Sequence, residues 1–526
     1  MRLKAELHDI MLQQHALMPD LDHDLGFIGS IFAHKRAWKH LHAEDENLYN
    51  ARDVDVTYSS WLQLLPLLRQ EGLLTLYQQT QVPLARICQL MREVGIKADP
   101  SRIREVRAKL QTDLRGLEAQ LPEKLRSYES PINKREPAPP GTLSAKTGKP
   151  IKFLMVPSTE TITPWRSPEF LKEYLYDELK LPQQLHPKTQ EVTVDKGALE
   201  KLFRKTKRPE LATLRAIKKL ATLLSGFATD TLAAAGIAHP HFNVHGTASG
   251  RLSSSEPNLQ NIPESARYLY VPRYPEWQFL QVDYSGIENR LTAFLADDEE
   301  RLRRFNTIPG FSEHKHAVEV FFGIPYAEVE KDNDKDAPYG KAKRIVHGVN
   351  YGMGARKIAN TFDMDERECR ELIFKWKNAI QATSRWQEST AALAKEQGWL
   401  VTPFGRKRWF YTDSYFTESL SFIPQSAAAD IIFKAMVVLL HERINLSRES
   451  ARLLLPHVEA LPRPAFLVLQ VHDSLLVEAP REMIPEVAGI IKRVMEQPIP
   501  ELGGFSIPVE TESGPSWGEM SKLEVN

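Results

Sequence analysis

Two apolar runs that each lead to an aspartate constrain the fold of this chain more than any other feature of the sequence. The first run, residues 277–282, leads directly to Asp283 and is followed by a helical pattern over 287–295. The second, residues 465–469, leads through a short polar stretch to Asp473, after which apolar residues resume. These patterns predict a strand ending at Asp283 and a β-hairpin with Asp473 at its turn.

Each aspartate alone has an ordinary explanation: Asp283 as a cap of the following helix, and Asp473 as a surface residue of a turn. As a pair they predict a different site, because two carboxylates can hold two metal ions about 3.5–4 Å apart. Two such ions can activate a hydroxyl nucleophile and stabilise a leaving phosphate in an in-line displacement.

Residues 341–352 carry charged and aromatic side chains at helical spacing. Lys343, His347 and Tyr351 are four residues apart, so on a helix they share one face. That face suits a triphosphate at one end and a stacked base at the other. An ordinary amphipathic helix would show the same spacing, and both interpretations remain open for this segment alone.

A polar run, TASGRLSSSEPNLQNIP, occupies residues 247–263. Its hydroxyls, amides and single arginine offer donors for a sugar–phosphate backbone and a minor groove. A structural loop of similar composition is the alternative explanation.

The chain has 526 residues, which predicts several domains because single cores stop growing at roughly 250–300 residues. Its net charge is zero, so total charge does not decide for or against a polyanionic partner. Basic residues gather locally between 196 and 219 and predict either a phosphate-contacting surface or a solvated helix face. They are Lys196, Lys201, Arg204, Lys205, Lys207, Arg208, Arg215, Lys218 and Lys219.

Cysteine and hydropathy patterns restrict the compartment. Cys88 and Cys369 lie far apart and form neither a disulfide framework nor a zinc motif. No uninterrupted apolar run reaches the roughly 18 residues of a membrane span, and the N-terminus lacks a signal-peptide core. We therefore expect a soluble, cytoplasmic protein with no membrane partner.

Composition also indicates how the chain is divided. Residues 1–75 and 76–130 show helical patterns, whereas 131–165 is rich in Pro, Gly, Lys and Thr and predicts an exposed loop or inserted flap. Helical patterns resume at residue 167 and include the basic run.

Taken together, these segments resemble family A DNA polymerases, the group that includes bacterial DNA polymerase I and phage enzymes, over roughly residues 76–526. The resemblance rests on TASGRLSSSEPNLQNIP, on DYSGIENR at 283–290, and on a lysine followed eight residues later by Tyr351 and a glycine. It implies an α+β right-hand fold with an antiparallel palm sheet. The palm would comprise 76–130, 241–295 and 456–526, the helical thumb 165–240, and the fingers 296–455.

The resemblance also implies residue roles. Asp283 and Asp473 match the catalytic metal ligands, and the carbonyl oxygen of Tyr284 would complete a shell for two Mg²⁺ ions, for which Mn²⁺ can substitute. Glu288 matches the steric gate against a ribose 2′-hydroxyl, and Lys343 the catalytic cation beside the triphosphate. The remaining dNTP contacts match His314, His347, Tyr351 and Arg344. The primer–template contacts match Arg251, Asn258, Gln260, Gln425, His472 and Tyr351.

Several positions depart from the family pattern. Tyr339 stands where an arginine often contacts the incoming phosphates, and Arg344, Lys341 or Arg356 is expected to substitute. His347 replaces a Phe or Tyr beside the sugar, which leaves the handling of dideoxynucleotides open. Ser474 and Gly286 replace a common Glu and Gln.

The N-terminal segment 1–75 resembles the end of a DnaQ-like 3′–5′ exonuclease, in which Tyr49 would orient water and Asp53 would bind metal. Such a nuclease needs about four carboxylates, and the 48 residues before Tyr49 contain no strand-borne Asp-x-Glu. We expect a truncated domain without proofreading, whether by natural loss, a separate gene or shortening of the chain.

The leading interpretation is a monomeric DNA-directed DNA polymerase that uses dNTPs on primer–template DNA, in replication or repair. Two alternatives remain: a nuclease acting through Asp53, and a non-catalytic primer–template binding protein. The sequence identifies no processivity factor.

Overall fold

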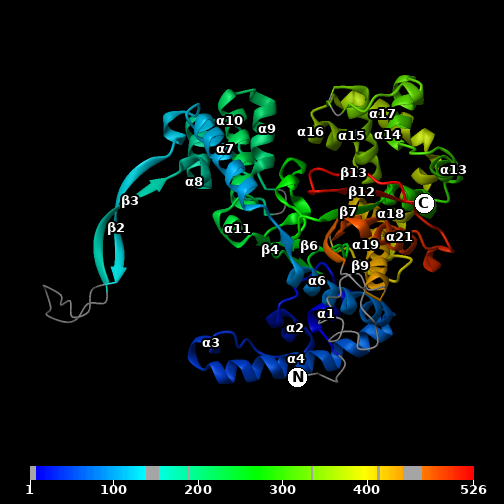
Figure 1. Cartoon of the computed structure of the whole chain (residues 1–526), viewed down its shortest axis with the longest axis horizontal. Coiled ribbons are helices and arrows are strands. Elements are labelled where there is room, and N and C mark those ends of the chain that lie inside the picture. The colour runs from blue at the N-terminus through cyan, green and yellow to red at the C-terminus, as the bar shows by residue number, and fades with distance from the viewer. Residues whose placement is uncertain are drawn as a thin grey trace. The chain divides into compact units, whose positions relative to one another are not determined.

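The structure is a computed structural model of the whole chain, and it describes residues 7–137, 153–186, 189–332, 334, 336–411, 415–441 and 465–525 (Figure 1). The chain forms two compact units, of which the first joins Met1–Asp99 to Ala235–Asn526 and the second is Pro100–Ala234. The expected palm segment 76–130 is therefore divided between the units after residue 99. Residues 442–464, which fall within the expected fingers and palm ranges, lie outside the described residues.

The first unit contains a five-stranded sheet in the order β10–β11–β7–β12–β13, and every neighbouring pair is antiparallel. The predicted antiparallel sheet is confirmed. Every apolar side chain of its central strand β7 is buried, because this strand is paired on both edges and packs against the helix α21 (Ile484–Met495). The strands are β7 (Trp277–Tyr284), β10 (Phe466–Val471), β11 (Ser474–Pro480), β12 (Val509–Gly514) and β13 (Ser521–Lys522).

The other elements of the first unit are mostly helices. Those before the sheet are α1 (Ile10–Leu17), α2 (Leu25–Phe32), α3 (Leu41–Glu44), α4 (Glu46–Gln70), α5 (Leu74–Leu76), the π-helix η1 (Tyr77–Gln81) and α6 (Val82–Val94). Those after β7 are α12 (Ile287–Leu295), α13 (Glu299–Thr307), α14 (Glu313–Phe322), α15 (Pro338–Asn350), α16 (Ala355–Phe362), α17 (Glu366–Ala379), α18 (Gln381–Gln397), α19 (Tyr415–His441) and α21 (Ile484–Met495). Short strand pairs are β1 (Ile96–Lys97) with β4 (Ile237–Ala238), β5 (His241–Asn243) with β6 (Ser253–Ser255), and β8 (Trp399–Val401) with β9 (Lys407–Trp409).

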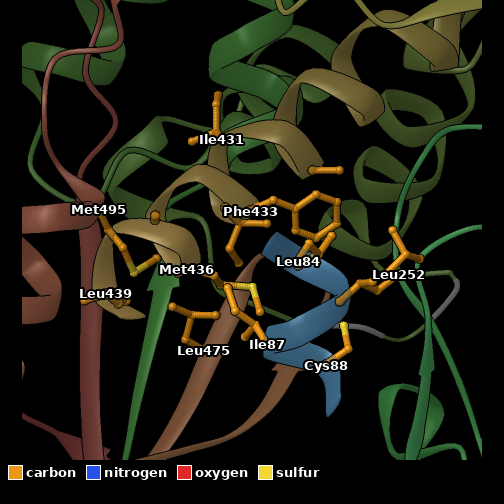
Figure 2. Close-up of a cluster of buried hydrophobic side chains, with 14 of the residues drawn as sticks. Leu84, Ile87, Cys88, Leu252, Ile431, Phe433, Met436, Leu439, Leu475 and Met495 are labelled. Carbon is orange, nitrogen blue, oxygen red and sulfur yellow. The ribbon is translucent and has the colours of Figure 1, made fainter. Parts of the chain in front are cut away.

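The core of this unit lies where α6 and α19 meet the sheet. Figure 2 shows Ile87 of α6 and Met436 of α19 beside Leu475 of β11, and all three are almost completely buried. Burying a side chain of this size stabilises the fold by about 1.5–3 kcal/mol. Among the described helices, only α19 is long and apolar enough to cross a membrane, but 78% of its apolar window is buried inside the protein. It is therefore explained as a core helix.

The second unit packs α7 (Pro100–Glu118) against α10 (Pro209–Gly226) around a core that includes Trp165 and Leu214. Its other elements are α8 (Pro168–Lys172), α9 (Lys196–Thr206), α11 (Asp230–Ala235), β2 (Tyr128–Pro137) and β3 (Phe153–Ile162). The segment predicted as an exposed loop or flap is a long antiparallel hairpin, β2–β3. The prolines and glycines of its expected tip, within 138–152, lie outside the described residues.

The basic run of the second unit lies on α9 and α10, as its helical pattern predicts. Acidic neighbours neutralise part of it: Arg204 and Arg215 pair with Glu200, and Arg208 pairs with Glu210 at 2.5 Å. The positive surface is therefore weaker than a count of lysines and arginines suggests.

Candidate active site

The strand register brings the two predicted aspartates together. On β7, Asp283 lies directly opposite Ser474 of β11. The tight turn between β10 and β11 contains His472, with a positive φ of 56°, and Asp473. The amide of Tyr284 donates to the backbone oxygen of Asp473 over 3.2 Å. The predicted hairpin is confirmed, and it places both carboxylates at one end of the central strands.

This carboxylate pair is partly buried and suited to a cation. Burial raises the pKa of both groups, and the pKa of Asp283 is raised further by Asp473 and by Glu510 of β12. Asp283 Oδ1 is buried without a hydrogen-bond partner in the described parts of the chain. Two repelling carboxylates with an unsatisfied oxygen fit a hard divalent cation, which prefers oxygen ligands.

The two aspartates alone do not complete the coordination shell of a metal ion, so its other ligands must include oxygen atoms that do not belong to acidic side chains. Within the described ranges, no group of three or more His, Cys, Asp or Glu residues is placed to hold a metal. The Tyr284 side chain is buried and its hydroxyl donates to the backbone oxygen of Met495 over 2.9 Å. Only its backbone carbonyl is therefore available as the predicted ligand.

Beside the hairpin turn lies a cavity of about 650 Å³. It collects most of the predicted site residues from four parts of the first unit: the polar loop before β7, α12, α14–α15 and the hairpin turn. Its predicted lining residues are Arg251, Glu288, His314, Lys343, Arg344, His347, Tyr351, His472 and Asp473.

Glu288, the predicted sugar gate, is held by two partners across this cavity. It forms an ion pair with Arg251 and accepts a hydrogen bond of 2.5 Å from the Tyr351 hydroxyl. Burial and the Glu288 carboxylate together raise the pKa of Tyr351, so the phenol stays protonated and donates. The C-terminal end of α15 thus contacts α12 through Glu288.

The α15 helix presents Lys343, His347 and Tyr351 toward the cavity, as the spacing predicts. The His347 and Tyr351 ring centroids are 4.7 Å apart. Burial, followed by Lys343 and His347, lowers the pKa of His314 to about 4. His314 is therefore neutral near pH 7, and its Nδ1 is buried without a hydrogen-bond partner in the described chain.

The structure also distinguishes the three proposed substitutes for the missing phosphate arginine. Tyr339 is buried and its ring lies edge-on to His314. Arg344 lines the cavity, and its Nη1 is buried with no hydrogen-bond partner among the described residues. Lys341 instead pairs with Glu368 at 2.5 Å, and Arg356 does not line the cavity. Arg344 is thus the cation left available to a ligand.

All the predicted primer–template residues except Asn258 line the main cavity, line the small cavity beside it or contact a residue that does. Gln425 of α19 hydrogen-bonds the Tyr351 side chain, and Gln260 donates to the side-chain oxygen of Gln470 over 3.0 Å. Asn258 lines neither the main cavity nor the small 40 Å³ cavity that Gln260 shares with Arg251. Its side chain instead accepts from Ser254 within its own loop.

Sequence reasoning missed several groups at the site. Asn350 lines the cavity and donates to Asn289 over 2.9 Å, and Phe362 of α16 lines the same cavity. Glu510 lies opposite Asp283 in the sheet. Asn350 could have been found from its helical spacing relative to His347, whereas Glu510 requires the strand register.

The N-terminal residues Tyr49 and Asp53 lie on α4, apart from this cavity lining. The Asp53 carboxylate accepts from the Trp38 indole at 2.6 Å and pairs with Lys39 at 3.2 Å. Residues 7–75, all described, form helices and no strand. An exonuclease remnant remains a prediction for this segment.

Comparison with known proteins agrees with this geometry. The family model of "DNA polymerase family A" matches residues 156–519. The chain is 29% identical over 467 residues to DNA polymerase I of Geobacillus stearothermophilus, covering 85% of this chain and 46% of that protein. It is also 29% identical over 465 residues to the thermostable DNA polymerase I of Thermus filiformis, covering 84% and 48%. The chain thus spans about half the length of the curated relatives it matches.

A solved structure described as the POL domain of Pol1 from M. smegmatis, in complex with DNA primer-template and dNTP, has the same fold. Its TM-score is 0.72 at 23% identity, and the match covers 97% of this chain and 82% of that one. The predicted α+β polymerase fold is confirmed. Because the family model matches well over half of its length, this chain belongs to DNA polymerase family A.

Proposed function

We propose that this chain is a DNA-directed DNA polymerase that adds dNMP to the 3′-end of a primer and releases pyrophosphate. The observation that carries this proposal is a pair of partly buried carboxylates, Asp283 and Asp473, of which Asp473 lines a cavity together with Lys343 and Arg344. Anionic ligands for a metal beside cations for a phosphate chain are what phosphoryl transfer requires.

Asp283, Asp473 and the carbonyl of Tyr284 would hold Mg²⁺ in this proposal, with Mn²⁺ as a substitute. When bound, the metal supplies charge stabilisation for the attacking and leaving oxygens. Lys343 and Arg344 neutralise the triphosphate, and Lys343 donates a proton to the leaving pyrophosphate. Neutral His314 offers a further contact to a phosphate oxygen through a ring nitrogen.

Glu288 serves as the sugar gate in this proposal. Arg251 and Tyr351 fix its carboxylate. A ribose 2′-hydroxyl would therefore have to displace this carboxylate, or would find no room beside it. dNTPs are therefore the proposed substrates. Tyr351 supports the templating base, while Arg251, Gln425 and His472 contact the primer terminus or its minor groove, with Gln260 beside them.

We also assign the domains by this function. The palm comprises 241–295 and 456–526 together with the start of 76–130, the thumb 165–240 and the fingers 296–455. The segment 1–75 has no proofreading role, because Asp53 is engaged by Lys39 and Trp38.

Extension of a labelled primer on a DNA template with Mg²⁺ tests the proposal, with dNTPs and NTPs in parallel and a 3′-mismatched primer included. We expect growth with dNTPs only and no trimming of the mismatch. No growth under any condition would refute the polymerase. Shortening of the mismatched primer would show that the N-terminal segment is a working nuclease.

A further inference from the structure

The N-terminal helices contact the loop that carries Arg251. His15 of α1 is 1% exposed, and its Nε2 lies 2.9 Å from the backbone oxygen of Thr247. The same oxygen accepts the Gly250 amide over 3.0 Å, which closes the turn of residues 247–250. One backbone carbonyl therefore joins α1 to the loop immediately before Arg251.

The hydrogen-bond network fixes the tautomer of His15. The Gln81 amide nitrogen lies 3.4 Å from His15 Nδ1. The backbone oxygen of Thr247 can only accept, so Nε2 carries the proton that it donates to Thr247, and Nδ1 is the acceptor that faces Gln81. Burial, followed by the nearby Arg406, lowers the pKa of His15 to about 3, so the ring is neutral at assay pH.

Further contacts hold the same loop. Gly250 has a φ of +77°, and a Cβ there would lie 2.4 Å from the guanidinium carbon of Arg406. Arg406 is itself fixed by a buried ion pair with Asp430 of α19. The Ser426 hydroxyl donates to the backbone oxygen of Ser249 over 2.6 Å. The loop is thus in contact with α1, with Arg406 and with α19.

The N-terminal helices also hold the segment that supplies Arg406. Asp20 pairs with Arg408 at 2.8 Å, and Glu71 pairs with Lys407 at 2.7 Å. Both contacts reach β9, directly after Arg406 in the chain. The helices therefore contact the loop directly through His15 and indirectly through β9.

Arg251 emerges from this loop into the cavity. The Thr247 hydroxyl donates to its backbone oxygen over 2.8 Å, and its guanidinium pairs with Glu288. A continuous series of contacts therefore runs from His15 through the 247–251 loop to the gate residue.

We propose that residues 7–75 act as a brace of the polymerase site, with His15 as a positioning residue that sets Arg251 against Glu288. This inference rests on the proposed function, in which Arg251 and Glu288 act on the primer end and the sugar. It gives the N-terminal segment a role that requires no nuclease activity.

Two isosteric variants test the contact. In His15→Gln the amide nitrogen can occupy the position of Nε2 and still donate to Thr247, whereas in His15→Asn it reaches only the position of Nδ1. We expect His15→Asn to lower kcat for single-nucleotide addition about tenfold with KM for dNTP nearly unchanged, because one buried hydrogen bond is lost. His15→Gln should remain within about twofold of the parent.

Val56→Ala is the matched control for stability. Val56 is 1% exposed in the core of the N-terminal helices, so its truncation removes packing without touching the loop. It should lower the melting temperature and leave kcat unchanged. Hydrogen exchange at the amides of 247–251 gives a second readout, which His15→Asn should accelerate and His15→Gln and Val56→Ala should not.

A double-mutant cycle with Arg251→Ala asks whether His15 acts through Arg251. In that background His15→Asn should change kcat less than about twofold. Equal effects of His15→Asn in both backgrounds, equal effects of the Asn and Gln variants, or a kcat loss in Val56→Ala would each overturn the brace. In all three cases the parent enzyme still extends primers, whereas a parent that extends nothing refutes the proposed function and the brace with it.

Discussion

The aspartate pair Asp283 and Asp473 and the single aspartate Asp53 lie in contrasting environments. At the end of the central sheet, Asp283 and Asp473 lie side by side and partly buried, and Asp283 keeps a buried oxygen without a partner among the described residues. On α4, Asp53 is neutralised by Lys39 and accepts from Trp38. Burial alone would raise the pKa of Asp53, but these hydrogen bonds together lower it.

The difference shows how a ligand site is distinguished from a structural ion pair. A carboxylate whose charge is already balanced by a side chain gains little from a metal, because the metal must first displace that partner. A repelling pair with an unsatisfied oxygen gains much, since a cation removes both the repulsion and the unsatisfied group. Sequence resemblance alone assigns a metal to both sites, and the local environment favours only the first.

The largest expected effect comes from making the same change at both sites. Asp473→Asn should lower the rate of primer extension at least about a thousandfold, or ~4 kcal/mol of transition-state stabilisation, because it removes a metal ligand. Asp53→Asn should leave the rate within about twofold. Single-turnover extension measures both, and a gel-shift assay should show that Asp473→Asn still binds primer–template. Equal losses in the two variants would remove the contrast.

Glu288 is an intermediate case between these two sites, because it lines the cavity but already has side-chain partners. Glu288→Ala should lower the preference for dNTPs over NTPs about a hundredfold, since the carboxylate that excludes the 2′-hydroxyl is gone. Competitive incorporation of matched dNTP and NTP measures this ratio.

Tyr351→Phe is the control for that gate, because it keeps the Glu288 carboxylate and removes only the phenol hydroxyl, with its hydrogen bonds to Glu288 and Gln425. It should lower the preference by less than about tenfold. Unchanged discrimination in Glu288→Ala would assign the gate to another residue.

The same contrast between a side chain with a partner and one without applies to the cations Lys341 and Arg344, with a smaller expected effect on the kinetics. Arg344→Ala should raise KM for dNTP about thirtyfold, as expected for the loss of charged hydrogen bonds to phosphate. Lys341→Ala should change it less than about twofold, because Lys341 already pairs with Glu368. Steady-state kinetics at several dNTP concentrations distinguish them, and the reverse order would mean that Lys341 leaves Glu368 when the substrate binds.

The smallest effect is expected when the N-terminal ion pair between Lys39 and Asp53 is removed, and it concerns the stability of the protein. Lys39→Met should lower the free energy of unfolding by no more than about 1 kcal/mol, because the Lys39 side chain is 48% exposed. Thermal melting measures this change. A larger loss would show that this ion pair stabilises the fold more than its exposure predicts. Mismatch trimming that appears only once Lys39 is removed would show that the lysine suppresses a metal site at Asp53.

The local elements of the site could be predicted from sequence because each follows from a short-range rule. The strand before Asp283, the helix 287–295 and the hairpin turn at Asp473 all arise from hydrophobic periodicity interrupted by polar residues. The common face of Lys343 and His347 follows from helical spacing.

Other features depend on contacts between distant segments and could not be predicted in this way. The pairing of Lys341 with Glu368 and the unsatisfied Arg344 nitrogen are set by the packing of α15. The prolines of 131–165 indicated a loop, yet two ten-residue strands pair there and include three of those prolines, Pro131, Pro137 and Pro157. A two-stranded hairpin tolerates them because the outer edge of each strand is unpaired. The division at residue 99 likewise depends on which core α7 joins.

The register at the hairpin has an evolutionary consequence. Because Asp283 faces Ser474, a one-residue insertion or deletion in the short turn between β10 and β11 that shifts β11 by one residue against β7 would turn every side chain of β11 to the opposite face. Asp473 would move away from Asp283, and the buried Glu478 of β11 would be turned away from its ion-pair partner Arg273. A single change in the length of this turn would therefore disrupt both the site and the sheet, so selection should remove it. This family can be expected to diversify by substitution here and to vary in length elsewhere.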